Sequence, residues 1–413
     1  MPAKARRSIR TLLIHSAFAS PDQPGGTRHY EFAQRLIAHG HRFAVVTGDV
    51  NYTTGSQVGH KGFITYQSEG GIDLYRSYTY KALHRSFVWR VIAFLSFAAT
   101  SVLAAFRAGP ADIIMGTTPP IFQAASACFV AFCRRRPFLL EVRDLWPSFA
   151  IDMGILTNPK LIAMSRWLER TLYRRATHLL VNSPAYRDYL ISRGVAPDKI
   201  TLVANGVDPS MFCPTDTGDQ TRRRFALENK FVVTYAGALG AANDIGTILK
   251  AAAELRDQAQ IHFLLVGDGK ERARLEQQMR ELGLNNVTFA GAQPKALMRE
   301  FLAASNACVA TLQNIPMFST TYPNKVFDYM AAGRPTLLGI DGVIRELIER
   351  AQGGIFIPPG NASALAAAVL KLSGNADLCR EMGRRARQYV VEHFNRDVQA
   401  GAFLELIERI AGA

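Results

Sequence analysis

A lysine and an aspartate stand three positions apart at the start of a predicted helix, in the segment S-T-T-Y-P-N-K-V-F-D-Y-M-A-A-G-R-P-T-L (residues 319–337). Pro323 has no amide hydrogen, so we expect it at the first helical position, with Tyr322 as the cap. The free amides of the first turn, the helix dipole and Lys325 together favour an anion, most naturally a diphosphate. Asp328 follows one turn later, where its carboxylate could accept hydrogen bonds from a ribose. The alternative is an ordinary helix start with two exposed charges.

Glycine-rich strand ends in the same half of the chain could complete a nucleotide-diphosphate site. They are Y-A-G-A-L-G (235–240), V-G-D-G-K (266–270) and F-A-G-A-Q (289–293). Glycine lets a backbone approach a phosphate or a sugar without a Cβ in the way, and the last segment can offer backbone groups to a base edge. The candidate ligand-binding residues in these segments are Gly237, Gly267, Ala292 and Gln293.

Two more glycines, Gly25 and Gly26, follow the first predicted strand and precede a helix that runs to Gly40. They could bring the backbone close to a phosphate or a sugar, or they could form a merely tight turn. The segment is not a G-x-G-x-x-G and no Walker lysine follows it. Dinucleotide binding and an NTPase activity are therefore not supported.

Polar residues also follow two apolar strands of the first half. Arg143 and Asp144 follow one of them, in E-V-R-D-L-W-P (141–147). Two adjacent charged residues are not expected in a hydrophobic core. Asp144 could orient or deprotonate the hydroxyl of an acceptor; its other possible roles are an ion pair with Arg143 or a helix cap. Thr117 and Thr118 lie at the end of a second strand. They are either hydroxyl donors at the same ligand-binding edge or turn residues.

Short apolar, β-rich runs alternate with longer helical stretches along the whole chain, which predicts parallel sheets covered on both faces. The expected strands are 11–16, 42–47, 74–80, 112–116, 138–143, 178–182 and 200–204, then 231–236, 262–266, 287–290, 307–311, 336–340 and 354–357. A stretch rich in Gly, Pro and Asp separates the two sets. We expect two doubly wound, Rossmann-like α/β domains facing each other across a cleft, with ligands at the carboxyl ends of the strands.

The expected boundaries follow from this pattern. They are a first domain over 1–208, a linker over 209–221, a second domain over 222–390, and a C-terminal helix over 391–413 that packs back toward the first domain. A chain of 413 residues is too long for one core, which agrees with two domains.

Charge is distributed unevenly between the two halves. Residues 1–210 hold 25 Lys and Arg against 13 Asp and Glu, whereas residues 211–413 hold 23 against 21. The basic half suits an anionic partner such as a membrane or a lipid-linked phosphate. No zinc-finger spacing, RNA-binding signature or basic region with heptads appears, so nucleic acid is disfavoured. Five cysteines without a C-x-x-C pair, and no secretory signal, indicate the cytoplasm.

Two apolar stretches, 87–106 and 121–133, lie in the basic half. Arg90 interrupts the first and leaves a run shorter than the roughly 20 residues that a bilayer span needs. It is either a buried helix or a helix that lies in the membrane interface. The second stretch ends in Arg134-Arg135-Arg136, and each arginine near an anionic surface adds about 1 kcal/mol of attraction. We therefore expect peripheral association with the membrane.

Five motifs in this order resemble the family 4 retaining glycosyltransferases of the GT-B fold, over nearly the whole chain. They are G-G-T-R-H-Y-E-F-A-Q-R-L-I-A-H-G-H (25–41), E-V-R-D-L-W-P (141–147), V-N-S-P (181–184), V-A-N-G-V-D (203–208) and P-N-K-V-F-D-Y-M-A-A-G-R-P (323–335). The chain is most similar to the group that builds bacterial O-antigen and capsule repeat units, including fucosaminyltransferase-like members.

The resemblance implies a role for each candidate. Gly25 and Gly26 would approach the donor phosphates, Asp328 would hold the ribose hydroxyls, and Lys325 with the backbone of Thr320, Thr321, Tyr322 and Asn324 would neutralise the diphosphate. The residues expected in catalysis are Asp144, Arg143 and Lys325, and those expected on the acceptor side are Thr117, Thr118 and Asp144.

The chain departs from the family pattern at three places. The usual pair of glutamates eight positions apart is here Thr320 and Asp328. The usual Arg and Lys after the first strand of the second domain are absent from 236–244, so Lys325 would carry more of the diphosphate charge. No histidine stands at Thr117 or Thr118, where many relatives have one.

The expected reaction is transfer of a sugar, of the N-acetylated kind, from a UDP-sugar to a polyprenyl-diphosphate-linked or other glycan acceptor in bacterial surface polysaccharide synthesis. Paired carboxylates for double displacement are not evident, so we expect front-face attack. Without a D-x-D motif or a His/Cys cluster, we expect no cofactor and no metal requirement. The alternatives are a UDP-sugar 2-epimerase on the same fold and a non-catalytic scaffold that binds a sugar nucleotide.

Overall fold

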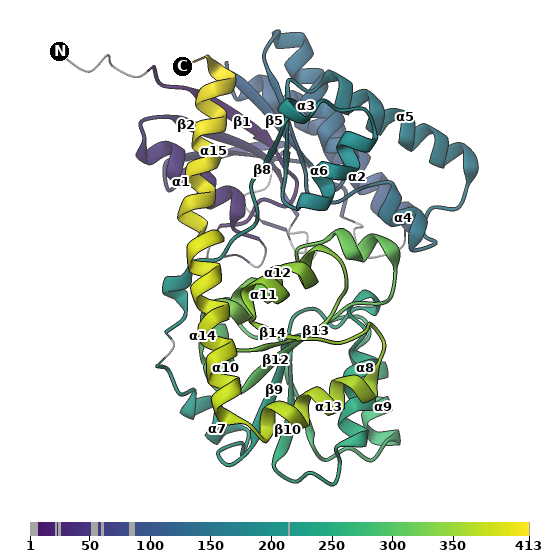
Figure 1. Ribbon diagram of the computed structural model, residues 1–413. Coiled ribbons are helices and arrows are strands. Elements are labelled where there is room, and N and C mark those ends of the chain that lie inside the picture. The colour runs from purple at the N-terminus through teal and green to yellow at the C-terminus, as the bar shows by residue number, and fades with distance from the viewer. Residues whose placement is uncertain are drawn as a thin grey trace, which may run out of the picture. The chain divides into compact units, whose positions relative to one another are not determined.

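The computed structural model describes residues 7–412, except 21–22, 24–25, 51–56, 59–61, 82–86 and 214; of Phe87 it describes only the backbone. The chain forms two compact units (Figure 1). Unit 1 comprises Met1–Ala204 and Gln399–Ala413, and unit 2 comprises Asn205–Val398. The chain therefore leaves unit 1 slightly before the predicted boundary at 208.

Unit 1 is built on an eight-stranded sheet in the order β3-β4-β2-β1-β5-β6-β7-β8. All neighbours are parallel except β3 and β4. The strands are β1 (Arg10–Ile14), β2 (Arg42–Gly48), β3 (Ile64–Glu69), β4 (Ile72–Ser77), β5 (Ile113–Thr118), β6 (Phe138–Val142), β7 (His178–Val181) and β8 (Ile200–Leu202). β3 is not among the strands expected from the sequence, because this edge strand is polar and only half-buried.

Helices cover both faces of this sheet. They are α1 (Arg28–Ala38), α2 (Phe87–Arg107), α3 (Ile121–Arg134), α4 (Ser148–Asp152), α5 (Pro159–Arg175), α6 (Pro184–Ser192) and α15 (Arg396–Ala411). α15 joins α1 in one core, where Phe403 stacks on Phe32 with 4.3 Å between ring centroids. α2 packs against α3, and α3 packs against α5. The predicted C-terminal helix over 391–413 begins later than expected, since α14 ends at His393 and α15 starts at Arg396.

Unit 2 is built on a fully parallel six-stranded sheet in the order β11-β10-β9-β12-β13-β14. The strands are β9 (Phe231–Ala236), β10 (Ile261–Val266), β11 (Val287–Gly291), β12 (Ala307–Thr311), β13 (Thr336–Gly339) and β14 (Gly354–Phe356). The helices are α7 (Asp219–Arg224), α8 (Ile245–Glu254), α9 (Arg272–Glu281), α10 (Met298–Ala303), α11 (Asn324–Ala331), α12 (Val343–Ala351), α13 (Ala362–Ser373) and α14 (Ala376–His393).

The residues of β2 and β5 in unit 1, and of β9 and β10 in unit 2, are almost continuously buried, as the apolar runs in the sequence predict. Separate hydrophobic cores fill the two sides of the unit 2 sheet. The prediction of two Rossmann-like α/β domains with parallel sheets is therefore confirmed. In such sheets the carboxyl ends of the strands carry the ligand-binding residues, and this edge is where the candidate residues lie.

Candidate functional site

Helix α11 presents the lysine and the aspartate with which the sequence analysis began. The helix starts at Asn324, so Pro323 occupies the cap position and not the first helical one, and no side chain caps it. Tyr322, predicted to be the cap, instead packs edge-on against Phe327 and Phe394, with ring centroids 5.7 and 6.0 Å away. The capping prediction is wrong because the aromatic ring gains more from burial than from facing the helix amides.

Lys325 reaches from α11 to the end of β9. Its Nζ donates to the hydroxyl of Tyr235 and to Oδ1 of Asn243, both at 2.8 Å, and lies 4.3 Å from the centre of the Tyr235 ring. Tyr329, one turn further along α11, accepts a hydrogen bond of 2.8 Å from the backbone amide of Ala236. Two side chains of α11 thus hold the helix against the strand end, which fixes the position of the lysine.

The Lys325 ammonium group has only neutral hydrogen-bond partners, a phenol and an amide. No carboxylate lies within ion-pairing distance of it in the described part of the chain. Burial lowers the pKa of Lys325 to about 7, because removing the amino group from water disfavours its charged form. Lys325 is partly exposed, but a cation largely removed from water is costly without a counter-charge, which a ligand could supply. This position is therefore suited to bind an anion.

Asp328 lies three residues after Lys325, so both side chains project from the same side of α11. Burial raises the pKa of Asp328 to about 6, although Lys295 and Arg396 act in the opposite direction. The carboxyl group makes no hydrogen bond to any residue that the structure describes. At neutral pH it is mostly ionised and can accept hydrogen bonds from hydroxyl groups of a ligand.

Gly237 and Gly267 lie together at the ends of β9 and β10. A Cβ on Gly267, which has a φ of +147°, would stand 1.8 Å from the carbonyl oxygen of Gly237. Gly267 is therefore required by the packing of the strand ends alone. A Cβ on Gly237 would lie 3.3 Å from Cε and Nζ of Lys325. The absence of a side chain at Gly237 leaves the lysine room beside the backbone.

The other residues predicted to bind the donor lie around these strand ends, and their role remains a prediction. The hydroxyls of Thr320 and Thr321 donate to the carbonyls of Met317 and Phe318 at 2.6 and 2.9 Å, within the 3-10 turn before α11. Gln293 folds back and donates to the carbonyl of Ala290 at 2.7 Å. Ala292 and Asn324 are exposed.

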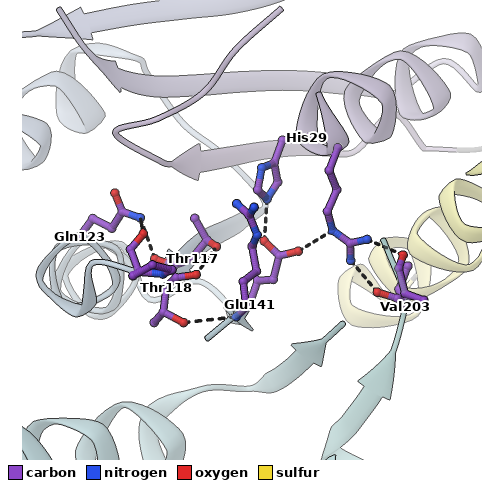
Figure 2. A network of polar contacts seen from close by, with 10 residues as sticks. His29, Thr117, Thr118, Gln123, Glu141 and Val203 are labelled. Carbon is purple, nitrogen blue, oxygen red and sulfur yellow. Dashed lines mark hydrogen bonds and ion pairs between the residues drawn. The ribbon is translucent and has the colours of Figure 1, made fainter. Parts of the chain in front are cut away.

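A buried ion pair network occupies the corresponding edge of unit 1 (Figure 2). Glu141, at the end of β6, accepts a hydrogen bond of 2.9 Å from Nε of Arg28, and its other oxygen lies 2.6 Å from Nε2 of His29. Arg28 also donates to the carbonyls of Val203 and Ala204, at 2.7 and 2.5 Å. The network therefore joins the start of α1, the end of β6 and the point where the chain leaves unit 1.

Glu141 is ionised at neutral pH. Burial by itself would raise its pKa, but His29 and Arg28 more than offset this and hold the pKa of Glu141 well below its ordinary value. Burial lowers the pKa of His29, so its imidazole is neutral. The sequence analysis did not single out Arg28, His29 or Glu141, although all three lie inside the quoted motifs. The available signal was the presence of charged residues in segments that are otherwise buried.

Thr117, Thr118, Arg143 and Asp144 lie at the same edge. Thr117 is completely buried and its hydroxyl donates to the Thr118 carbonyl at 3.4 Å, so its role on the acceptor side stays a prediction. The hydroxyl of Thr118 accepts from the Arg143 amide at 3.3 Å and donates to the Asp144 carbonyl at 3.4 Å, which ties β5 to the residues after β6. Burial raises the pKa of Asp144 to about 6, against the effect of Arg143.

Several buried polar atoms at this edge have no hydrogen-bond partner among the described residues. They are Nδ1 of His15, Oγ of Ser16, Nε of Arg143 and Oδ1 of Asn182. These residues follow β1, β6 and β7 directly. Native proteins leave few such atoms unpaired, so their concentration here suits a polar ligand. The sequence analysis missed His15, Ser16 and Asn182, which a search for polar residues just after buried strands would have found.

The glycine turn of unit 1 is described in part. Gly25 lies outside the described residues. A Cβ built on Gly26 would meet nothing within 4 Å, so packing does not explain the glycine at this position. Among the residues that the structure describes, no group of three or more His, Cys, Asp or Glu side chains could hold a metal ion.

Two family models match the chain, and together they cover most of it. Residues 25–206 match the glycosyl transferase 4-like domain, and residues 218–389 match the glycosyl transferases group 1. Among curated proteins, the colanic acid biosynthesis glycosyl transferase WcaI of Escherichia coli (strain K12) is 24% identical over 407 residues, which cover 94% of this chain and 99% of WcaI. The amylovoran biosynthesis glycosyltransferase AmsK of Erwinia amylovora is 26% identical over 58% of each chain.

Solved structures show the same architecture. Sucrose-phosphate synthase from Thermosynechococcus elongatus matches with a TM-score of 0.76 at 20% identity, over 98% of this chain and all of that one. Anabaena HepE in complex with UDP-glucose matches with a TM-score of 0.72 at 18% identity, over 97% of this chain and all of that one. The fold is that of the GT-B glycosyltransferases, and with the two domain matches the chain belongs to the family 4 glycosyltransferases.

Proposed function

We propose that this protein is a retaining glycosyltransferase that moves a sugar, of the N-acetylated kind, from a UDP-sugar to a polyprenyl-diphosphate-linked or other glycan acceptor. The setting would be the synthesis of a bacterial surface polysaccharide at the cytoplasmic face of the membrane. Family membership supports the reaction class. The names of WcaI and AmsK, which refer to colanic acid and amylovoran biosynthesis, support the setting.

The observation that carries the proposal is the unneutralised charge of Lys325 at the carboxyl edge of the unit 2 sheet. A diphosphate would supply the missing counter-charge, and the first-turn amides of α11 would add hydrogen bonds to it. Asp328, on the same side of the helix, would accept hydrogen bonds from the ribose. The backbone at Gly237 would lie against the phosphates, since no side chain intervenes there.

Uridine is the base that we propose for the donor. HepE, which shares the fold, is described in complexes with UDP and with UDP-glucose. A relative from Mycobacterium tuberculosis, 28% identical over 52% of each chain, is named a GDP-mannose-dependent mannosyltransferase. Titration of the protein with UDP and with GDP distinguishes the two bases, and tighter binding of GDP would overturn this part of the proposal.

The proposed step is a front-face displacement. The bond between the anomeric carbon and the leaving phosphate oxygen breaks, and a bond from that carbon to the acceptor oxygen forms on the same face. The acceptor proton passes to the leaving phosphate, so the step requires neither a second carboxylate nor a metal ion. Lys325 would stabilise the charge that develops on the diphosphate. Asp144 would orient the acceptor hydroxyl, with Arg143 beside it.

The test is a transfer assay with UDP-sugars and a lipid-linked acceptor, comparing the wild type with Lys325→Ala. Loss of one charge-assisted contact costs about 1.5–3 kcal/mol, which corresponds to turnover slower by roughly ten- to a hundredfold. A wild-type rate in the variant would reject the assignment of Lys325.

The same assay tests the metal requirement. We expect full activity in EDTA, and activity that is lost in EDTA but restored by Mg²⁺ would show that a metal ion is required.

The same assay separates the proposal from its rivals. Turnover of the nucleotide sugar without an acceptor, giving an epimeric sugar, would identify an epimerase. Binding of UDP without transfer to any acceptor would identify a scaffold. This alternative is considered because Thr320 replaces the glutamate that the family usually has at this position.

A further inference from the structure

We infer that three neighbouring helices of unit 1, α2, α3 and α5, form one surface that docks on an anionic lipid bilayer. We call it the docking surface. It consists of the exposed faces of Val88–Arg107, Ile121–Arg134 and Pro159–Arg175, which belong to one side of the unit 1 sheet (Figure 1). The inference concerns binding to lipid, so it stands or falls separately from the transfer reaction.

The exposed side of α2 is apolar, whereas the exposed side of an ordinary surface helix is polar. Its exposed positions are Val88, Ile92, Leu95, Ala99, Leu103, Phe106 and Arg107. The first six recur every three or four residues, so they lie on one side of the helix, within an arc of about 80° at 100° per residue. A helix that faces water carries polar residues on that side. On α2, every exposed residue before the terminal arginine is apolar.

The opposite side of α2 is packed on protein. Ala93, Phe97 and Ala104 are buried, and the hydroxyl of Thr100 donates to the Tyr78 carbonyl at 2.7 Å. In the described part of the chain α2 is the one helix long and apolar enough to cross a membrane, and 33% of its apolar window is buried. Because one side already contacts the sheet and α3, we infer that α2 lies on the bilayer and does not span it.

The neighbouring helices continue the apolar surface. On α3 the exposed residues are Phe129, Phe132 and Cys133, and Phe132 is 70% exposed. On α5 Leu161, Met164 and Trp167 are exposed at a spacing of three residues. Exposed apolar side chains gathered on neighbouring elements mark sites that bind a membrane or another protein. The sequence analysis predicted the contribution of α2 and α3 and missed that of α5.

Cations surround this surface at one end. Arg134 lies over the Phe106 ring at 5.2 Å, and Arg175 lies over the Phe132 ring at 5.8 Å. These contacts bring the C-terminal ends of α2, α3 and α5 together. The further arginines there are Arg107, Arg135, Arg136 and Arg174. None of the residues exposed on the three helices is acidic.

The arginines without acidic neighbours favour an anionic lipid bilayer as the partner of the docking surface. Helices that merely face solvent balance their charges, as α12 and α14 of unit 2 do with Arg345–Glu349 and Arg384–Glu381 pairs. Aromatic and aliphatic side chains bordered by unbalanced arginines match an anionic headgroup layer above an acyl layer. α3 also begins beside Thr118, at the carboxyl edge of the sheet, where the acceptor side of the site is proposed. A lipid-linked acceptor would thus reach the site from the same bilayer.

The test is co-sedimentation of the full chain with vesicles, measured without a sugar nucleotide. The wild type should bind vesicles of phosphatidylglycerol and phosphatidylcholine, bind less at high salt, and not bind pure phosphatidylcholine. Leu103→Glu should weaken binding tenfold or more, on the order expected for a lost buried leucine. Leu370→Glu, on the exposed side of α13 in unit 2, is the matched control and should bind like the wild type.

Replacing exposed arginines tests the electrostatic part. Arg136→Gln and Arg174→Gln should each weaken binding about fivefold, the factor expected for one cation near an anionic surface. The proposal is overturned if the wild type stays in the supernatant at low salt while it still binds UDP, or if the Leu103 and Leu370 variants bind equally. It is also overturned if Leu103→Glu only converts a dimer into a monomer and leaves vesicle binding unchanged, since the surface would then be an interface between copies.

Discussion

Each unit has a charged side chain at the carboxyl edge of its sheet, fully buried in unit 1 and partly buried in unit 2, but only one of the two charges is paired with an opposite charge. In unit 1, Glu141 lies between Arg28 and His29 and has a partner for each oxygen. In unit 2, Lys325 contacts only the neutral groups of Tyr235 and Asn243. A buried charge that is paired needs no ligand, and removal of its partner is strongly destabilising. A poorly solvated charge without an opposite charge is costly unless a ligand supplies one. The comparison therefore supports our proposal that Lys325 binds a ligand, and it leaves Glu141 a structural role.

The largest effect that we expect is on stability, from Glu141→Ala. Removal of the carboxylate leaves Arg28 buried without a counter-charge, and breaking a buried pair in this way costs about 3–5 kcal/mol. Urea unfolding of the purified protein measures the loss. Glu349→Ala, which removes an exposed partner of Arg345, is the control and should cost less than about 1 kcal/mol. If Glu141→Ala loses no more free energy of unfolding than Glu349→Ala, Glu141 does not have the structural role that the comparison gives it.

The second effect is on donor binding, from Asp328→Ala. A hydrogen bond to a charged group contributes about 1.5–3 kcal/mol, so UDP should bind ten- to a hundredfold more weakly. Inorganic diphosphate lacks a ribose and should bind the variant as it binds the wild type. Equal losses for both ligands would mean that Asp328 shapes the anion site and does not contact the ribose.

The smallest effect is a gain of stability in Lys325→Met. The folded-state pKa of Lys325, about 7, lies below the ordinary value of 10.5. Between these values the unfolded chain holds a proton that the folded chain has released, so wild-type stability rises with pH over this window. The variant lacks this cost, which the full pKa difference would put at about 4 kcal/mol at pH 7. Loss of the two lysine hydrogen bonds and the partial exposure of the side chain should reduce the net gain to about 1 kcal/mol, and this gain should disappear toward pH 10.

Thermal unfolding of the wild type and the Met variant at several pH values measures this difference. If Lys325→Met is less stable than the wild type at pH 7, the hydrogen bonds of the lysine outweigh its desolvation, and the lysine is a structural residue like Glu141.

The sequence predicted the parts of the site that depend on local pattern. Apolar runs in the sequence predicted the strands, and the polar residues just after them, such as Asp144, lie at the edge where we propose that ligands bind. Lys325 was recognised because its proline and its apolar helix are local signals. The edge strand β3 was missed because its polar residues lack the apolar run of a buried strand.

Local sequence patterns could not predict contacts between residues that are far apart in the chain. Glu141 is 113 positions from Arg28, and Lys325 is 90 from Tyr235. No spacing rule connects them, so only the fold shows which of these charges is matched. Thr117 illustrates the converse, since the sequence offered its hydroxyl as a possible donor and the fold buries it completely.

The pH dependence of UDP binding tests most directly whether Lys325 holds the donor diphosphate. An anion binds the protonated lysine, so the affinity of the wild type for UDP should fall above about pH 7, by up to tenfold per pH unit. Lys325→Arg, whose side chain stays charged, should lose this dependence, and Lys325→Met should bind weakly at every pH. The affinities of the wild type and the Met variant should differ most at pH 7 and converge toward pH 9. Titration calorimetry that gives the two proteins the same affinity at pH 7 would contradict the account.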